Sequence, residues 1–380
     1  MRPLKILDRY ILKNFLGTFV VTELVVLVLA TIVDMSEKID KYLTNQAPAS
    51  EIATYYLNFA LYYGNMYMSL VVFLAATIFT SKFAARSEII AIMSAGVNYN
   101  RFLRPYLYGA VLLTALSLLI NNFILPYSNI RRLDFEAHYV KPRDENYQVV
   151  QDIHKQVGPG QIIYIKDWNV GRAVGSYFTF EQYDSTGTMT HKFSSEHITY
   201  DRETSHYRLT NYFSKDLRED GSEDISSGYT IDTVFAFTPA DFSMDKHVGD
   251  KKNSIELQKL IRLEQQRGSP DVRTLITERY KRVALPFSSI ILTVLAVALC
   301  SRKKRGGTGI NIAIGIVLMA AYLFMLRVFE TTAAKSTDGS PLFWIWLPNI
   351  LFAGIAYYVT IQSSYLIINI IYIGTKKNNP

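Results

Sequence analysis

Long apolar runs alternate with polar segments at both ends of this 380-residue chain. A helix needs about 20 mainly apolar residues to cross the hydrocarbon core of a bilayer. Six runs have about this length, and they lie at Ile11–Val33, Tyr55–Thr80, Phe102–Leu125, Val283–Cys300, Gly309–Val328 and Phe343–Ile361. We therefore expect six transmembrane helices, three on each side of a polar middle segment.

The middle segment has a different pattern, in which apolar residues alternate with polar ones over short stretches. Aromatic and β-branched residues dominate these stretches, which are Gln161–Ile165, Ser176–Tyr183, His197–Asp201, His206–Phe213 and Thr233–Phe237. Such alternation, interrupted by turn-forming sequences at 184–187 and 219–222, predicts antiparallel strands in a sandwich, jelly roll or open barrel. The predicted fold is a 3+3 helical membrane protein with an inserted, jellyroll-like β-domain, divided into residues 1–125, 126–253 and 254–380.

A segment after the predicted strands, Ser254–Gln266, carries apolar residues at helical spacing among charged ones. We expect an amphipathic connector helix that lies at the outer membrane surface, in preference to a helix that docks a partner.

Lysine and arginine residues mark one side of the membrane. They gather before the first run, between the second and third, after the fourth and at the C-terminus: Arg2, Lys5, Arg9 and Lys13; Lys82, Arg86, Arg101 and Arg104; Arg302–Arg305; Lys376 and Lys377. If six helices alternate in direction, these groups share one side, which the positive-inside rule assigns to the cytoplasm. Both termini are then cytoplasmic and the middle segment is extracytoplasmic. The same groups explain much of the net charge of +7, so we expect no nucleic-acid partner.

The loop between the second and third runs holds a short half-polar stretch, Ser87–Gly96 (SEIIAIMSAG). At 3.6 residues per turn, an apolar face comprises Ile89, Ile92, Met93 and Gly96, and a face of small side chains, with Glu88 at its border, comprises Ser87, Ala91, Ser94 and Ala95. The closing glycine fits a left-handed C-cap. Two interpretations fit this spacing: an interfacial helix in which Glu88 offsets Arg86 or the helix dipole, and a helix that docks against another protein.

Cations lie near the predicted outer ends of three helices: Lys38, Lys41, Arg131, Arg132 and Arg327. Cations at this height suit phosphate or carboxylate headgroups. Ordinary lipid contact is the plainer interpretation for the first four. Pairing with Glu330, one turn away, is the plainer one for Arg327.

Several kinds of chemistry lack their sequence motifs. The chain has no Gly-x-x-x-x-Gly-Lys-[Ser/Thr] phosphate-binding loop, no His-Glu-x-x-His and no Gly-x-Ser-x-Gly. Its six histidines are scattered over or beside the predicted β-domain, and Cys300 is its only cysteine. We therefore expect no metal, cofactor or catalytic site. Any ATP that drives the protein is expected to be hydrolysed by a separate subunit.

Three classes of function remain: an ATP-driven permease, an ion-coupled carrier, and a membrane-anchored sensor or assembly protein. The permease accounts for the short helix, the missing phosphate-binding loop and the β-domain together. A carrier needs carboxylates or broken helices near the midplane, where the apolar runs offer little beyond Glu23. A sensor explains the topology but not the short helix with its small-residue face.

Three motifs and the order of the elements resemble one family along essentially the whole chain. The motifs are Leu7-Asp8-Arg9-Tyr10-Ile11, Arg86–Gly96 and Tyr280-x-Arg282-x-x-x-Pro286-Phe287. With three helices on each side of a β-rich domain, they resemble the permeases of the lipopolysaccharide export transporter, the LptF/LptG family. The first two motifs look more like the G-type permease. The resemblance implies a bacterial inner-membrane permease that pairs with a second permease and is driven by a cytoplasmic ABC ATPase dimer.

The resemblance also implies roles for residues. A coupling helix at about 82–97 would sit in a groove of the ATPase through Glu88, Ser87, Ala91, Ser94 and Ala95. A basic rim for the lipopolysaccharide phosphates would comprise Lys38, Lys41, Arg131 and Arg132, with Arg327 as a further candidate. The β-domain would pass lipid to a periplasmic bridge protein along Phe178, Phe180, Phe235 and Phe237, although alternation alone does not distinguish a lipid path from a closed core. A single-helix accessory protein would insert beside the first or fifth helix.

Overall fold

The computed structural model describes residues 5–140, 149–217, 222–235, 237–239, 248–266, 269, 271–301, 307–336 and 339–377, and side chains only as far as residue 365. The chain divides into two compact units. The membrane unit comprises Met1–Leu133 and Ile276–Pro380, and the β unit comprises Asp134–Leu275.

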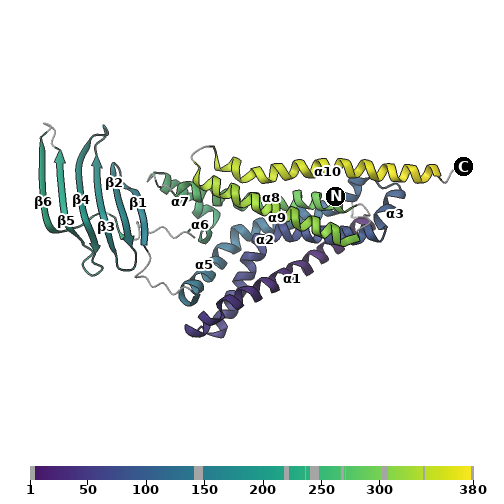
Figure 1. The fold of residues 1–380 in the computed structure, drawn as a ribbon, viewed down its shortest axis with the longest axis horizontal. Helices are drawn as coiled ribbons and strands as arrows, with labels where there is room; N and C mark the ends of the chain where they lie inside the picture. The colour runs from purple at the N-terminus through teal and green to yellow at the C-terminus, as the bar shows by residue number, and fades with distance from the viewer. Residues whose placement is uncertain are drawn as a thin grey trace. The chain divides into compact units, whose positions relative to one another are not determined.

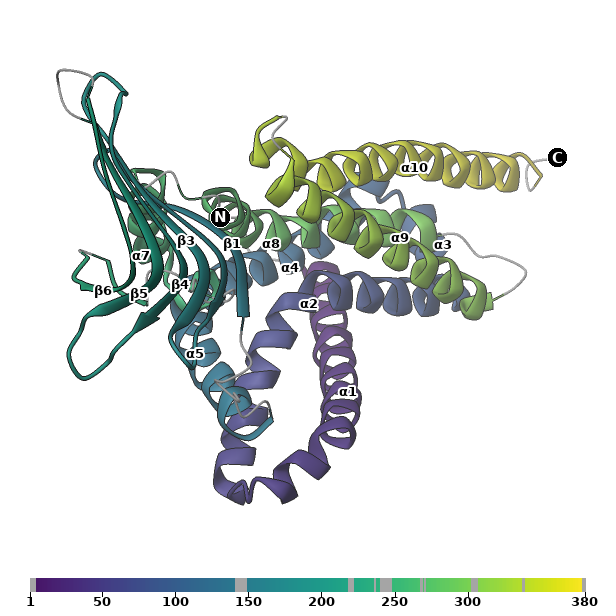
Figure 2. The same ribbon diagram turned by 60° about the vertical axis from the view of Figure 1, so that its left-hand side comes forward.

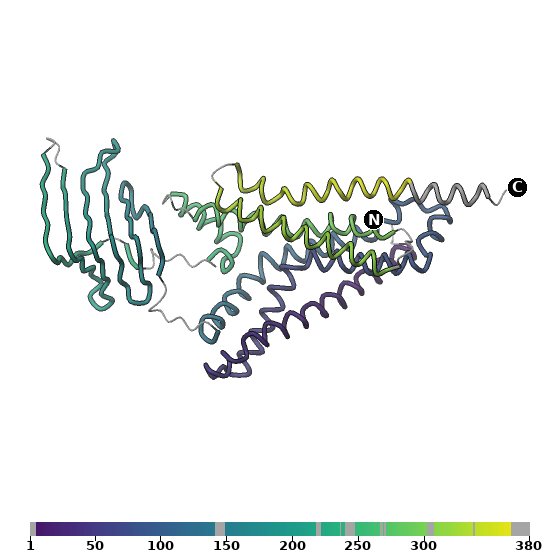
Figure 3. Tube along the Cα trace, viewed as in Figure 1, coloured from purple at the N-terminus to yellow at the C-terminus, as the bar shows by residue number. Residues whose placement is uncertain are grey.

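Six helices are long and apolar enough to cross a membrane, which confirms the six predicted spans. They are α1 (Ile6–Thr44), α2 (Ala49–Ala85), the helical segment from Tyr99 to Val140, α8 (Val272–Cys300), α9 (Gly307–Lys335) and α10 (Pro341–Lys377). Helices α1 and α2 run side by side in opposite directions, while α9 packs against α2 and α10 (Figures 1 and 3). The helices exceed their apolar runs because the polar residues at their ends continue the same backbone hydrogen bonding.

The third span continues past its predicted end at Leu125. It consists of α4 (Tyr99–Leu119), a π-helical turn η1 (Ile120–Ile124), α5 (Leu125–Phe135) and a second π-helical turn η2 (Glu136–Val140). Pro126 has no backbone N–H to donate, and the wider turn before it lets the helix continue without that hydrogen bond. The predicted end was therefore wrong. Arg131 and Arg132 lie on α5, not in a segment after the helix.

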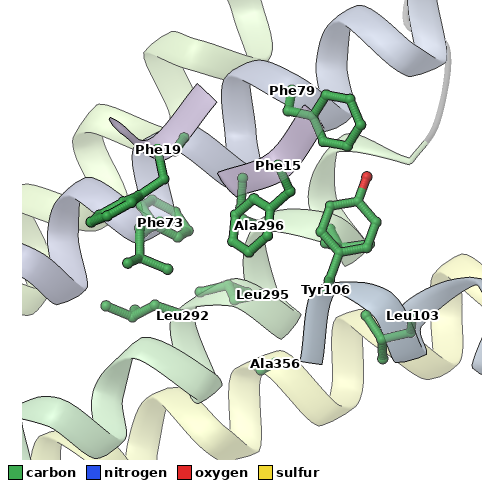
Figure 4. Close-up of a cluster of buried hydrophobic side chains, with 14 of the residues drawn as sticks. Phe15, Phe19, Phe73, Phe79, Leu103, Tyr106, Leu292, Leu295, Ala296 and Ala356 are labelled. Carbon is green, nitrogen blue, oxygen red and sulfur yellow. The ribbon is translucent and has the colours of Figure 1, made fainter. Parts of the chain in front are cut away.

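The membrane unit has an apolar core to which every span contributes. Phe15 of α1, Phe73 of α2, Tyr106 of α4 and Leu295 of α8 gather there (Figure 4). Helix α1 approaches α4 closely at Gly109, where a Cβ atom would lie 2.8 Å from the Phe15 ring. A glycine at this position therefore lets the Phe15 ring lie directly on the α4 backbone.

Pro286 lies inside α8 and leaves the carbonyl oxygen of Arg282 without its usual helical donor. That oxygen accepts a hydrogen bond from the Asn121 side chain at 3.4 Å. Nearby carbonyl oxygens also receive side-chain donors from other helices: Ala284 from Asn349 at 2.8 Å, Leu285 from Ser69 at 2.7 Å and Pro286 from Thr114 at 3.1 Å. The third motif thus binds α8 to α2, to the third span and to α10 through the α8 backbone.

The β unit contains one antiparallel sheet of six strands in the order β1-β2-β3-β4-β5-β6, which confirms the inserted antiparallel β-domain. The strands are β1 (Val149–Gly158), β2 (Gln161–Asn169), β3 (Val174–Tyr183), β4 (Met189–Tyr200), β5 (Tyr207–Leu217) and β6 (Glu223–Thr233). Figure 2 shows that the sheet twists and bends strongly. The two edge strands, β1 and β6, were not predicted. The predicted strand Thr233–Phe237 is wrong, because β6 ends at Thr233.

The predicted helix Ser254–Gln266 is confirmed as α7, and a single helical turn, α6 (Val248–Lys251), precedes it. Asn253 caps α7: its side-chain oxygen accepts from the backbone N–H groups of Ile255 and Glu256, and the Glu256 carboxylate accepts from the Asn253 N–H. Leu257 and Ile261 form the buried face of this helix.

Candidate functional site

The short stretch between the second and third spans folds as α3 (Glu88–Ser94). The predicted apolar face is buried at Ile89 and Met93 and half-buried at Ile92, but it does not include Gly96, which is exposed. The predicted small-residue face is exposed at Ala91, Ser94 and Ala95. Gly96 has φ +83°, the left-handed conformation that was predicted for it. Helix α3 therefore buries Ile89 and Met93 on the side that contacts α2 and α10, and it leaves a surface of small side chains uncovered.

Ser87 sets the direction in which α3 leaves α2. It has φ 63°, a left-handed conformation that costs a non-glycine residue about 1–2 kcal/mol. Its backbone N–H donates to the carbonyl oxygen of Ala84, and its carbonyl oxygen accepts from the N–H of Ala91. The sharp turn thus joins the last turn of α2 directly to the first turn of α3, and Ser87 belongs to this turn more than to the small-residue face.

Glu88 lies beside residues of the first motif. Its carboxylate accepts a hydrogen bond from the Tyr10 hydroxyl at 3.3 Å and lies 3.9 Å from the Arg86 guanidinium. The Glu88 side chain stays 33% exposed, so part of the carboxylate remains open to another molecule. The first and second motifs, far apart in the sequence, therefore meet at one end of the membrane unit.

A second link joins the same region. The Arg101 guanidinium at the start of α4 contacts the Asp8 carboxylate at 2.6 Å. Asp8 is nearly buried at the start of α1. The pair holds the beginnings of α1 and α4 together beside α3, and the sequence did not predict it because the two residues are more than ninety positions apart.

The five predicted headgroup cations fall into different environments. Lys41 and Arg131 are exposed and form no ion pair within the part of the chain that the structure describes. Lys38 instead contacts Asp34 at 2.7 Å and donates to the Tyr55 hydroxyl at 2.6 Å. Lys41 and Arg131 are therefore the more open of these cations.

Arg132 is 4% exposed, so its guanidinium is not presented at the surface. It lies over the Tyr62 ring at 4.4 Å and donates from Nε to Asn129 at 3.2 Å. Stacking of this kind stabilises a guanidinium away from bulk water. Arg132 thus fastens α5 to α2 within the membrane unit.

Arg327 pairs with Glu330 at 3.0 Å, as its plainer interpretation predicted, yet its side chain remains 53% exposed. It lines a surface groove of about 670 Å³ on α9, together with Phe324, Val328 and Lys335. The groove is apolar with a cation toward each end, which suits a lipid with an anionic headgroup.

Glu330 also belongs to a chain of ion pairs that the sequence did not reveal. Lys281 of α8 contacts Glu330 at 2.8 Å and Glu278 at 2.6 Å. The ion pairs therefore connect the exposed side of α9 to α8 at the start of the third motif, and the residues that form them are Arg327, Glu330, Lys281 and Glu278. Glu278 and Lys281 share one helix face at i, i+3 spacing, but Glu330 comes from another helix, α9, and reaches Lys281 only in the folded chain.

The four predicted lipid-path phenylalanines of the β unit form one cluster. Phe178 and Phe180 lie on β3 and are 1% and 7% exposed. Phe235 and Phe237 come from the segment after β6, not from a strand as predicted. The Phe235 ring lies 5.5 Å from that of Phe178 and 5.4 Å from that of Phe180. The structure thus joins the four residues but divides them between the sheet and a segment that covers it.

Comparisons with known proteins identify the family. No curated protein matches the chain. Residues 9–362 match the family described as "Lipopolysaccharide export system permease LptF/LptG". The match includes all three motifs from Arg9 onward, the spans and the β unit, and it does not separate the F-type from the G-type, so the G-type remains a prediction. The chain therefore belongs to the LptF/LptG family of lipopolysaccharide export permeases, multi-pass proteins of the inner membrane.

Proposed function

We propose that this chain is one permease of an ATP-driven ABC exporter, which extracts lipopolysaccharide from the inner membrane and passes it through the β unit to a periplasmic bridge protein. Its partners would be a second permease of the family, a cytoplasmic ATPase dimer and a single-helix accessory protein. One observation carries the proposal: α3 presents Ala91, Ser94 and Ala95 on an uncovered face with Glu88 at its border. The sequence has no phosphate-binding loop, so ATP would be hydrolysed by a separate subunit. The uncovered face of α3 would be the surface to which that subunit attaches.

The distribution of lysine and arginine supports an orientation for this complex. With both termini and α3 in the cytoplasm, α3 faces the ATPase, and the β unit faces the periplasm. The outer cations then lie at the height of the outer-leaflet headgroups. Lys41 and Arg131, which are exposed, make the first contacts with lipid phosphates, and Arg327 exchanges its contact with Glu330 for a phosphate.

This assignment predicts which cations matter for lipid retention. Lys41→Gln combined with Arg131→Gln is expected to lower the lipopolysaccharide retained by the purified complex roughly thirtyfold, since each of the two cations contributes about 1 kcal/mol near an anionic headgroup. Lipid is quantified by mass spectrometry after extraction. Lys13→Gln, an exposed cation near the other end of α1, serves as the control. Equal lipid losses in the double variant and the control would contradict the assignment.

The proposal is tested by reconstitution. The chain, a second permease and the ATPase are placed in proteoliposomes with lipopolysaccharide, and a soluble bridge protein with a photo-crosslinker is added outside. We expect ATP-dependent labelling of the bridge protein by lipopolysaccharide. An assembled complex that hydrolyses ATP without any labelling would overturn the proposal.

The ion-coupled carrier retains one observation in its favour. Glu23 is half-buried in α1, and one of its carboxylate oxygens is buried with no hydrogen-bond partner within the described residues. The other lies where a Cβ atom on Gly64 would be only 2.9 Å away. If a proton gradient without ATP drives transfer in the same vesicles, and Glu23→Gln abolishes it, the carrier replaces the ATP-driven permease.

A further inference from the structure

Two aromatic residues that follow β6, Phe235 and Phe237, lie on the apolar face of the sheet. We refer to the described residues of the segment after β6, Val234, Phe235 and Phe237–Pro239, as the strap. Phe235 packs on Phe178 of β3, and Phe237 packs on Tyr207 of β5 at a ring distance of 5.3 Å. The two strap rings also stack on each other at 4.7 Å. The strap thus places two aromatic side chains on the face that carries the predicted lipid path.

The position of the strap is unusual for a segment that follows an edge strand. Two strands, β4 and β5, separate β3 from β6 in the sheet order. Three strand spacings amount to about 14 Å across a flat sheet. Phe235 nevertheless reaches β3 only two residues after Thr233, because the sheet bends (Figure 2). The strap therefore lies across a concave apolar face and closes it.

Neighbouring residues of β5 fasten the strap. Arg208 forms two hydrogen bonds with the Asp232 carboxylate, at 2.9 and 3.2 Å, and this contact lowers the pKa of Asp232. The pair fixes the end of β6, where the strap begins. The buried Tyr207 hydroxyl donates to the carbonyl oxygen of Phe237 at 3.0 Å. An ion pair thus holds the residue before the strap, and ring contacts together with a hydrogen bond from Tyr207 hold its middle.

The face beneath the strap contains a polar group that an ordinary core seldom leaves unsatisfied. Ser195 of β4 lies opposite Phe178 in the register and is 6% exposed. Its hydroxyl has no hydrogen-bond partner within the described residues. A buried hydroxyl without a partner is destabilising. The ester or amide group of an acylated lipid would supply one.

We propose that the strap is a lid that competes with the acyl chains of a lipid for the apolar face of β3–β5. Phe178 and Phe180 line the lipid path, whereas Phe235 and Phe237 occupy that path until acyl chains displace them. The inference rests on the proposed function and assigns opposite roles to residues that the sequence placed together. A lining residue strengthens lipid binding, but a lid residue weakens it.

The roles are separated by photo-crosslinking in the reconstituted complex with purified lipopolysaccharide. The crosslinker replaces Phe193 of β4, which belongs to the same apolar cluster but whose described ring contacts are with Tyr212 and His191, not with the strap. Phe235→Ala is expected to raise labelling in the absence of ATP by about fivefold, the scale expected for losing aromatic ring pairs. Val234→Ala, an exposed neighbour in the strap, is expected to leave labelling unchanged.

Tyr207→Phe keeps the ring and removes the hydroxyl that donates to the strap, so it is also expected to raise labelling about fivefold. Reduced or unchanged labelling in both variants would overturn the lid. ATP-driven transfer to the bridge protein is measured in the same vesicles. If lipid is transferred but the strap variants leave labelling unchanged, only the lid proposal is wrong. If the unsubstituted protein transfers no lipid, both the proposed function and the lid proposal are wrong.

Discussion

Glu88→Lys is expected to reduce the ATPase retained by the purified membrane complex at least tenfold. In the proposed complex the Glu88 carboxylate is covered when the small-residue face of α3 meets the ATPase. Removing one partner of a buried, hydrogen-bonded charge pair typically costs about 2–5 kcal/mol. A lysine also places a like charge near the Arg86 guanidinium, which lies 3.9 Å from the Glu88 carboxylate. Retention is measured by affinity purification through the permease, followed by quantification of the ATPase.

Two controls separate this effect from a disturbed permease. Tyr10→Phe removes the hydrogen bond that Glu88 receives within the chain, and it is expected to leave ATPase retention nearly unchanged. Glu51→Lys makes the same charge change on an exposed residue at the opposite end of α2. Normal ATPase retention by Glu88→Lys, at normal permease yield, would exclude Glu88 from the coupling contact. Equal losses in Glu88→Lys and Glu51→Lys would assign the effect to net charge.

The spans were predictable because the bilayer imposes a single strong requirement, a run of about 20 apolar residues. The ends of the helices were not, because no such requirement acts on residues outside the hydrocarbon core. Pro126 illustrates the difference. It is a helix-ending signal in water-exposed segments, but here a π-helical turn accommodates it and the helix continues to Val140.

The β unit shows where alternation succeeds and where it misleads. Inner strands such as β3 have one buried and one open face, so their sequences alternate. Strand β6 is exposed along most of its length, and residues such as Ser226 and Tyr229 give no alternating signal. The strap alternates like a strand because Phe235 and Phe237 point to the sheet, although its backbone belongs to no strand. The pattern detects burial, not strand pairing.

The features of the candidate site that depend on residue spacing within one helix were predictable from the sequence. Glu88 and the small-residue face of α3 follow from spacing alone, and so would the Lys38–Asp34 pair at i, i+4. Contacts between helices required the structure. The burial of Arg132 against Tyr62 is the clearest example, since nothing in the sequence around Arg132 distinguishes it from its exposed neighbour Arg131.

Gly160→Ala is expected to open the β1–β2 hairpin and accelerate amide hydrogen exchange in β2 and β3 at least thirtyfold relative to a matched glycine substitution. Gly160 has φ +65°, a conformation that costs alanine about 1–2 kcal/mol. An added Cβ atom would also collide with the carbonyl oxygen of Tyr183, a backbone atom that cannot move without disturbing β3. The Gly160 carbonyl oxygen accepts from the Tyr183 N–H at 2.7 Å, so relieving the collision weakens this hydrogen bond.

The matched variant is Gly187→Ala in the β3–β4 turn. Gly187 also has a left-handed backbone, with φ +83°, but an added Cβ atom there meets nothing within 4 Å. Its substitution therefore costs only the backbone strain, about 1–2 kcal/mol. The difference between the two variants isolates the collision with Tyr183, which we expect to contribute about 2 kcal/mol or more, the equivalent of roughly thirtyfold in exchange.

Exchange is followed by mass spectrometry on the full chain in detergent. Similar exchange rates in the two variants would mean that the β1–β2 turn moves away from Tyr183 at little cost in free energy. The β1 edge of the sheet would then be less rigid than the contact between Gly160 and Tyr183 indicates.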